Sequence, residues 1–284
     1  MIKVFKTDLF RLFRSKTFYV FPIFVTVILI IELLFSAVVK EAESEVYNED
    51  GSMTVSIDIK ETPSEEQYEK FGISTLLESI TDGTLLLFLG IALVIFATNE
   101  SRNGFVKTAA GCVQDKGYMP LSKIAVGAVI VVIYTLEFAV LRFIFTAFTA
   151  AINGKSLKYV SLPEGDAGKF AGYILLCVLV HIAFSAMLML MHEMFRSRAI
   201  GIVWIFLEST GLFAQLASAL VVMLQTWFKI LPDFNISNYL LMNNISDGYA
   251  SKAFNPVILL IMSLIYIGCA GGAAMWMAKH RDVR

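Results

Sequence analysis

Long apolar stretches separated by shorter polar segments dominate the chain. A helix that crosses a lipid bilayer needs about 20 mostly apolar residues, and six stretches reach or approach that length. They cover residues 17–39, 73–98, 124–152, 170–191, 199–224 and 256–278. These stretches lack the period-two alternation that is typical of strands in membrane barrels. The pattern therefore predicts an all-α, polytopic membrane protein with six transmembrane helices.

The chain reads as a single transmembrane domain, residues 1–284, with two further helical features outside the six spans. Residues 2–14 predict an interfacial helix within residues 1–16. Its apolar face holds Ile2, Phe5, Leu9, Leu12 and Phe13, and its opposite face holds Lys3, Arg11 and Arg14. The apolar groups of residues 227–255 predict a re-entrant outer segment before the sixth span. The third stretch exceeds the bilayer thickness, so we expect it to be tilted or extended.

Composition agrees with a membrane location and excludes other classes. Hydrophobic residues make up 57% of the 284 residues, charged residues 17%, and the mean hydropathy is +0.71. Aromatic residues at 13% and a net charge of −1 exclude a disordered chain. A pI of about 6.3 offers no basic surface for a nucleic acid.

The distribution of lysine and arginine predicts the orientation. Segments 1–16, 99–123, 192–198 and 279–284 carry 14 basic residues, whereas 40–72, 153–169 and 225–255 carry 8 in a greater length. Cytoplasmic loops are the ones enriched in these residues, so both termini and segment 99–123 are expected in the cytoplasm. The acidic segment 40–72 is then an outer loop. The expected location is a plasma membrane, of bacterial type.

Motifs for catalysis or metal binding are absent from the sequence. There is no HExxH helix, no GxSxG turn, and no phosphate-binding loop on the cytoplasmic side. We therefore expect no enzyme activity, metal or nucleotide site in this chain.

Ionisable residues within the apolar stretches are the first functional candidates, because charges in hydrocarbon are costly and often functional. A polar path between helices is one interpretation, and structural hydrogen bonding between helices is the other. The residues are Glu32, Glu137, Arg142, His181 and Glu208.

Segment 99–123, between the second and third stretches, is the most informative part of the chain. It reads NESRNGFVKTAAGCVQDKGYMPLSK, and residues 101–112 could form a short helix along the membrane face. Gly117 and Pro120 then interrupt the chain before Lys123 opens the third stretch. About 25 residues exceed what a simple reversal needs, so this segment is suited to contact with a soluble partner.

This segment resembles the corresponding loop in permease subunits of ATP-binding-cassette exporters of the second type. Glu100, Gly104, Lys107 and the pair Ser122-Lys123 match that family's loop in type and spacing, and Lys116 stands where the family has arginine. The six spans, the basic N-terminal helix and the long outer first loop also match the family plan.

The resemblance implies that ATP and Mg²⁺ bind a separate ATP-binding subunit, with no cofactor on this chain. A second permease copy or a paralogous permease completes the transporter within membrane lipid. The loop would act as a coupling helix, and its expected contact residues are Glu100, Arg102, Gly104, Phe105, Lys107, Lys116 and Lys123.

The implied function is export of, or self-protection against, a hydrophobic or amphipathic substrate such as an antimicrobial peptide, drug or lipid. An alternative is a non-transporting membrane protein, an immunity or scaffold subunit that sequesters a ligand or regulates a partner. An intramembrane enzyme is a poorer alternative, because no catalytic constellation is present.

Overall fold

The computed structural model describes residues 2–46, 68–72, 79–81, 83–102, 115–152, 156–160, 167–228, 234–241 and 255–280. The described chain is helical apart from one short parallel pair of strands. The helices are α1 (Ile2–Arg14), α2 (Lys16–Val46), α4 (Gly83–Arg102), α6 (Tyr118–Ile152), α7 (Ala167–Phe195), α8 (Arg198–Ser209), α9 (Leu212–Phe228), the 3₁₀ helix η1 (Ile236–Tyr239) and α11 (Pro256–His280). The strands are β1 (Tyr68–Gly72) and β2 (Ser156–Val160), paired in the register Tyr68 to Ser156.

Three helices, α6, α7 and α11, are long and apolar enough to cross a membrane. The number rises to as many as five if each of two bent pairs, α1 with α2 and α8 with α9, is one span. The apolar part of α4, Gly83–Asn99, is shorter than the other candidates. Several membrane-crossing helices indicate a multi-pass membrane protein, while the full set of six spans stays a prediction.

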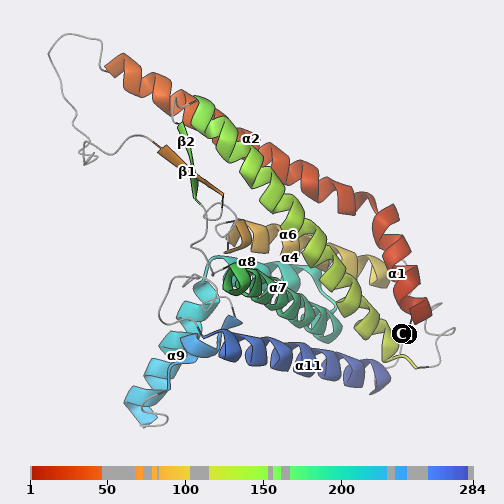
Figure 1. Ribbon diagram of the computed structural model, residues 1–284. Coiled ribbons are helices and arrows are strands. Elements are labelled where there is room, and N and C mark those ends of the chain that lie inside the picture. The colour runs from red at the N-terminus through yellow and green to blue at the C-terminus, as the bar shows by residue number, and fades with distance from the viewer. Residues whose placement is uncertain are drawn as a thin grey trace.

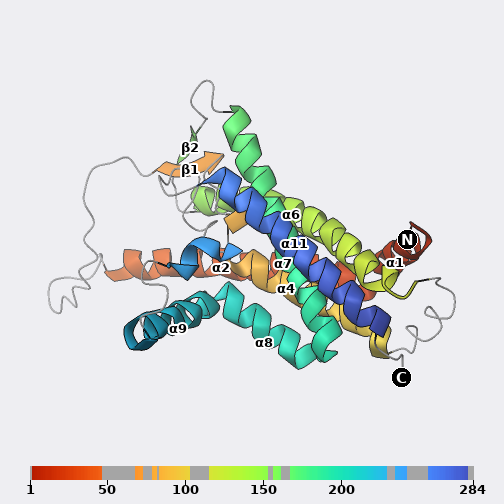
Figure 2. The same cartoon turned by 90° about the horizontal axis from the view of Figure 1, so that it is seen from below.

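The elements form an elongated helical bundle (Figures 1 and 2). Helix α7 packs against α6, α4 and most extensively against α11, so it occupies the centre of the bundle. Helix α1 lies at the same end as the start of α6 and the end of α11 (Figure 1). The two strands lie beside the opposite end of α6, and α9 projects away from the bundle.

The junction of α2 with α6 is fixed by an aromatic stack and one hydrogen bond. Pro22 lies inside α2 and has no N–H group, so the carbonyl of Phe18 loses its normal helical partner. The hydroxyl of Tyr134 on α6 donates to that carbonyl at 2.9 Å. The Tyr134 ring stacks on Phe21 with centroids 4.1 Å apart. Tyr134 thus satisfies the backbone group that the proline leaves open.

The predicted span over residues 199–224 contains a sharp bend. Helix α8 ends at Ser209, and α9 begins at Leu212 after a bend of 78°. Gly211 adopts a left-handed backbone angle of +71°, which suits glycine at a helix end. The hydroxyl of Thr210 donates to the carbonyl of Phe206 at 2.7 Å, and the backbone N–H of Gly211 donates to the backbone carbonyl of Glu208. These local bonds close α8 after only 12 residues.

Other predicted features change in extent. Helix α2 continues to Val46, beyond the predicted end of the first span at residue 39, and α6 covers the long third stretch as one helix. The N-terminal amphipathic helix is present, but its buried face includes Asp8 beside Leu12, while Ile2 is 72% exposed. Most of the outer segment 40–72 and of the predicted re-entrant segment 227–255 lies outside the described residues.

Helices α4 and α8 approach closely because glycine stands at both contact points. A Cβ atom on Gly90 of α4 would lie 2.7 Å from the Ile205 side chain, and one on Gly201 of α8 would lie 2.8 Å from Val94. Small residues at such contacts allow tight packing of membrane helices.

We predict that Gly90→Leu destabilises the protein by about 1–3 kcal/mol, the usual cost of overpacking a core. Thermal unfolding in detergent measures the change. Gly172→Leu is the matched control, because a Cβ atom at Gly172 meets nothing within 4 Å. Equal unfolding midpoints for the two variants would contradict the close contact of α4 with α8.

Candidate functional site

Segment 99–123, the predicted coupling loop, is described only at its two ends. Glu100 and Arg102 belong to the last turn of α4, and Lys116 lies in the turn that precedes α6. Gly104, Phe105 and Lys107 lie outside the described residues, as does most of the predicted short helix over 101–112. The structure therefore shows how the two ends of this segment are attached to the bundle. We call these attachments anchors.

The first anchor joins the end of α4 to the start of α8. The Nε atom of Arg198 donates to the hydroxyl of Thr98 at 2.6 Å, and its terminal nitrogen donates to the Asn99 side-chain oxygen at 2.7 Å. Arg198 is held opposite α4 because α7 and α8 are separated by only two residues, of which Arg196 has a positive φ of 47°. This short reversal directs the guanidinium of Arg198 toward the end of α4.

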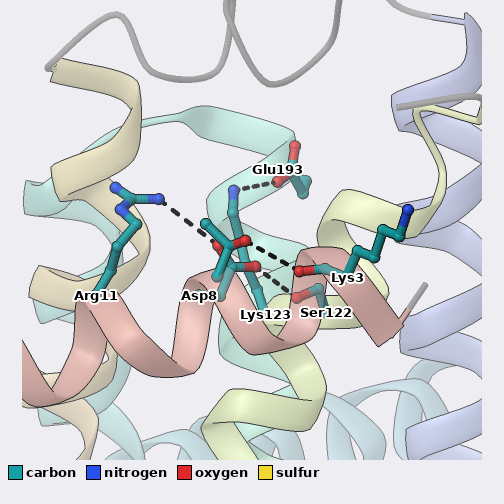
Figure 3. A network of polar contacts seen from close by, with 7 residues as sticks. Lys3, Asp8, Arg11, Ser122, Lys123 and Glu193 are labelled. Atoms are coloured by element: carbon teal, nitrogen blue, oxygen red, sulfur yellow. Dashed lines mark hydrogen bonds and ion pairs between the residues drawn. The ribbon is translucent and has the colours of Figure 1, made fainter. Parts of the chain in front are cut away.

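The second anchor is an ion pair between α6 and α7. The ammonium of Lys123 lies 3.1 Å from the carboxylate of Glu193, and their side chains are only 5% and 13% exposed. A buried pair of this kind is poorly screened by salt, and each charge depends on the other for compensation. Lys123, predicted as a coupling residue, therefore has a partner on α7 (Figure 3).

The third anchor joins α1 to α6 at the neighbouring residue. The hydroxyl of Ser122 donates to the carboxylate of buried Asp8, and Arg11 lies 3.6 Å from the same carboxylate (Figure 3). The sequence predicted Arg11 on the face of α1 opposite the apolar residues. In the structure the Arg11 guanidinium lies beside the Asp8 carboxylate. The interfacial helix is thus attached to the bundle by polar contacts as well as by apolar packing.

The fourth anchor joins the end of α11 to the turn before α6. The ammonium of Lys279 lies 2.9 Å from one carboxylate oxygen of Asp115, and the other oxygen accepts the backbone N–H of Gly117 at 2.9 Å. The hydrogen bonds from Lys279 and from Gly117 lower the pKa of Asp115 below its usual value. Asp115 therefore stays ionised well below neutral pH.

Together these contacts hold both described ends of segment 99–123. The polar anchors at its α4 end and its α6 end come from four other helices, α1, α7, α8 and α11. Sequence reasoning missed the partners Asp8, Asp115, Glu193, Arg198 and Lys279. The one available signal was Asp8, an acidic residue within an otherwise basic amphipathic helix.

The five intramembrane candidates come from four helices. Glu32 belongs to α2, Glu137 and Arg142 to α6, His181 to α7 and Glu208 to the last turn of α8. Arg142 lines a small pocket whose other walls are mostly apolar side chains of α2, α4 and α6. A continuous polar path through all five residues stays a prediction.

His181 is the most deeply buried of these residues, with no exposed surface. Its Nδ1 atom lies 2.8 Å from the carbonyl of Cys177, one turn earlier in α7. Within the described part of the chain its Nε2 atom has no hydrogen-bond partner. The local bond to Cys177 is typical of a histidine packed into a helix interface.

In comparisons with known proteins, no family model and no curated protein matches this chain. The resemblance of segment 99–123 to a permease coupling loop therefore rests on its own residues. No group of three or more potential metal ligands occurs among the residues that the structure describes.

We predict that Lys123→Met destabilises the protein by about 3–5 kcal/mol, because it removes one partner of a buried ion pair. Glu193→Gln should also destabilise it. The double variant should lose much less than the sum of the two single losses, and a thermal unfolding cycle measures the difference. Additive losses would show that the two side chains do not interact.

Proposed function

We propose that this chain is the membrane-spanning subunit of an ATP-driven exporter of the second ATP-binding-cassette type. Its substrate would be hydrophobic or amphipathic, and a separate ATPase would dock on segment 99–123. A second permease chain would complete the transporter. The end of the bundle that carries α1 would face the cytoplasm, in agreement with its basic residues.

One observation carries the proposal: segment 99–123 is attached at both ends to helices other than its own. A soluble partner that displaces this segment would pull on α8 through Arg198, on α7 through Glu193 and on α11 through Lys279. Because packed helices move as units rather than deforming continuously, such contacts are suited to transmit motion into the bundle.

The proposed mechanism needs two alternative packings of the helical bundle. ATP-driven closure of the ATPase pair would favour one packing, and substrate would favour one of the two as well. Through the anchors, closure of the ATPase and binding of substrate would act on the same conformational equilibrium. This chain would then need no nucleotide site of its own. A scaffold or immunity subunit needs a partner contact but has no need to pass its motion to four helices.

The first test is purification of the chain from its native membrane. We expect an ATP-binding subunit to copurify, and hydrophobic or amphipathic compounds to stimulate ATP hydrolysis by the complex. Mass spectrometry identifies the subunit, and phosphate release measures hydrolysis. Copurification without any stimulation would favour the scaffold or immunity alternative, and no ATPase at all would contradict the proposal.

The second test separates docking from transmission. Arg198→Leu should leave the ATPase bound but reduce substrate stimulation about fivefold or more, the lower range of typical coupling between sites. Glu100→Lys, within the loop itself, should weaken docking as well. Lys169→Leu is the control, because Lys169 is an exposed cation near the start of α7, far along that helix from Glu193. Equal stimulation in all three variants would exclude the assigned role of the segment.

A further inference from the structure

The bend between α8 and α9 places an acidic side chain in an apolar setting. Glu208 lies in the last turn of α8, next to the residues that close the helix. By length and composition the two helices together qualify as a broken membrane span or a re-entrant loop. Irregular backbone within a membrane occurs where protein or a polar cavity surrounds it, so a break at this position indicates a site rather than a simple lipid contact.

The Glu208 carboxylate has no cationic partner within the described part of the chain. Asp8, Asp115 and Glu193 each have a cation beside them, whereas Glu208 makes no ion pair among the described residues. A carboxylate in hydrocarbon without a counter-charge is costly, and such a residue normally pairs with a cation or takes up a proton. A bound cation would supply the counter-charge that Glu208 lacks.

Aromatic side chains lie on both sides of the bend at Glu208. Trp204 lies four residues before Glu208, which places both on one face of α8. The Trp204 ring contacts the ring of Phe213 on α9 across the bend, with centroids 4.7 Å apart. The indole N–H of Trp204 is buried and has no hydrogen-bond partner among the described residues.

The fourth side chain of the cluster comes from α11. Tyr266 lies beside η1, which in turn packs against α9 next to the bend. The Tyr266 hydroxyl donates to the carbonyl of Tyr239 in η1 at 3.3 Å, which fixes the direction of its ring. Three elements, α8, α9 and α11, thus bring aromatic rings to the region of the bend.

We propose that the α8–α9 bend binds a lipophilic organic cation, an alkyl- or aryl-substituted ammonium or phosphonium group. The carboxylate of Glu208 supplies the counter-charge, and the rings of Trp204, Phe213 and Tyr266 supply the faces to which such cations are attracted. A bare metal cation is less suited, because it needs several oxygen ligands, and the described residues hold no group of three acidic or other metal-binding side chains.

Glu137 provides a comparison within the same chain. It is also a carboxylate inside an apolar helix, and it too makes no ion pair among the described residues. The nearby ring of Tyr134 is stacked on both Phe21 and Phe18, so its faces are covered by other rings. Glu137 therefore has the charge of Glu208 but lies in the middle of a continuous helix, without the aromatic pair across a bend.

Binding of a cation at the bend does not depend on the proposed function. If the chain is an exporter subunit, as proposed above, such a cation would be a transported substrate. The experiment therefore uses the purified chain alone, without any ATPase. The chain is reconstituted in nanodiscs of uncharged phosphatidylcholine, and binding of radiolabelled tetraphenylphosphonium is measured by equilibrium dialysis. Tetraphenylborate, of the same shape and opposite charge, is the competitor that tests for charge recognition.

We expect saturable binding at one site for each chain, without competition by tetraphenylborate. Glu208→Gln, which keeps the size of the side chain, should raise Kd about tenfold or more, because it removes a charge pair from a poorly screened site. Glu137→Gln should leave Kd unchanged. Phe213→Leu, which retains charge and apolar volume, should raise Kd about threefold, the effect of one cation–π contact.

The variants are compared only when they elute as single peaks with unfolding midpoints near that of the parent chain. Phe213→Leu alone carries the test if Glu208→Gln does not fold. No saturable binding to the parent chain, equal effects of Glu208→Gln and Glu137→Gln, or an unchanged Kd in Phe213→Leu would each overturn the inference. Those results would leave the copurification test of the proposed function unaffected.

Discussion

Hydrocarbon offers no hydrogen-bond partner, so a polar group within a membrane span is costly unless the protein supplies its partner. The contact of α2 with α6 illustrates this constraint. Pro22 leaves the carbonyl of Phe18 without its helical donor, and Tyr134 supplies a hydroxyl from another helix. A local defect of one helix thereby fixes the position of its neighbour, and the aromatic stack around Tyr134 excludes other polar partners from the site.

The same constraint gathers charged side chains at one end of the bundle. Lys123, Glu193 and Arg198 lie near helix ends, and Asp8 lies in the short helix α1 at the same end of the bundle. Each meets a partner from a different helix. The consequence is functional as well as structural. Segment 99–123 leaves the bundle between these contacts, so any force on it reaches helices that are distant in sequence. Polar contacts that stabilise the helix ends also determine which helices move together.

The parts of this arrangement that depend on local patterns were predictable from the sequence. The apolar stretches predicted the positions of α6, α7 and α11, and the amphipathic pattern predicted α1. The partners were not predictable, because Asp8 and Ser122 lie 114 positions apart and only packing brings them together. The bend after Ser209 was missed for another reason. The sequence Ser-Thr-Gly is a plausible helix end, but continuous apolar residues on both sides favour an unbroken helix.

Helix α8 relates the two sites to each other. Arg198, at its start, holds the end of α4, and Glu208, near its other end, lies about 15 Å further along at the helical rise of ~1.5 Å per residue. Gly90 and Gly201 let α4 and α8 pack with little space between them, so the two helices have little freedom to move separately. A ligand that neutralises Glu208 would favour one angle of the α8–α9 bend. Through the rigid α8 it would favour one position of Arg198, and by linkage a partner that moves segment 99–123 would change affinity at the bend.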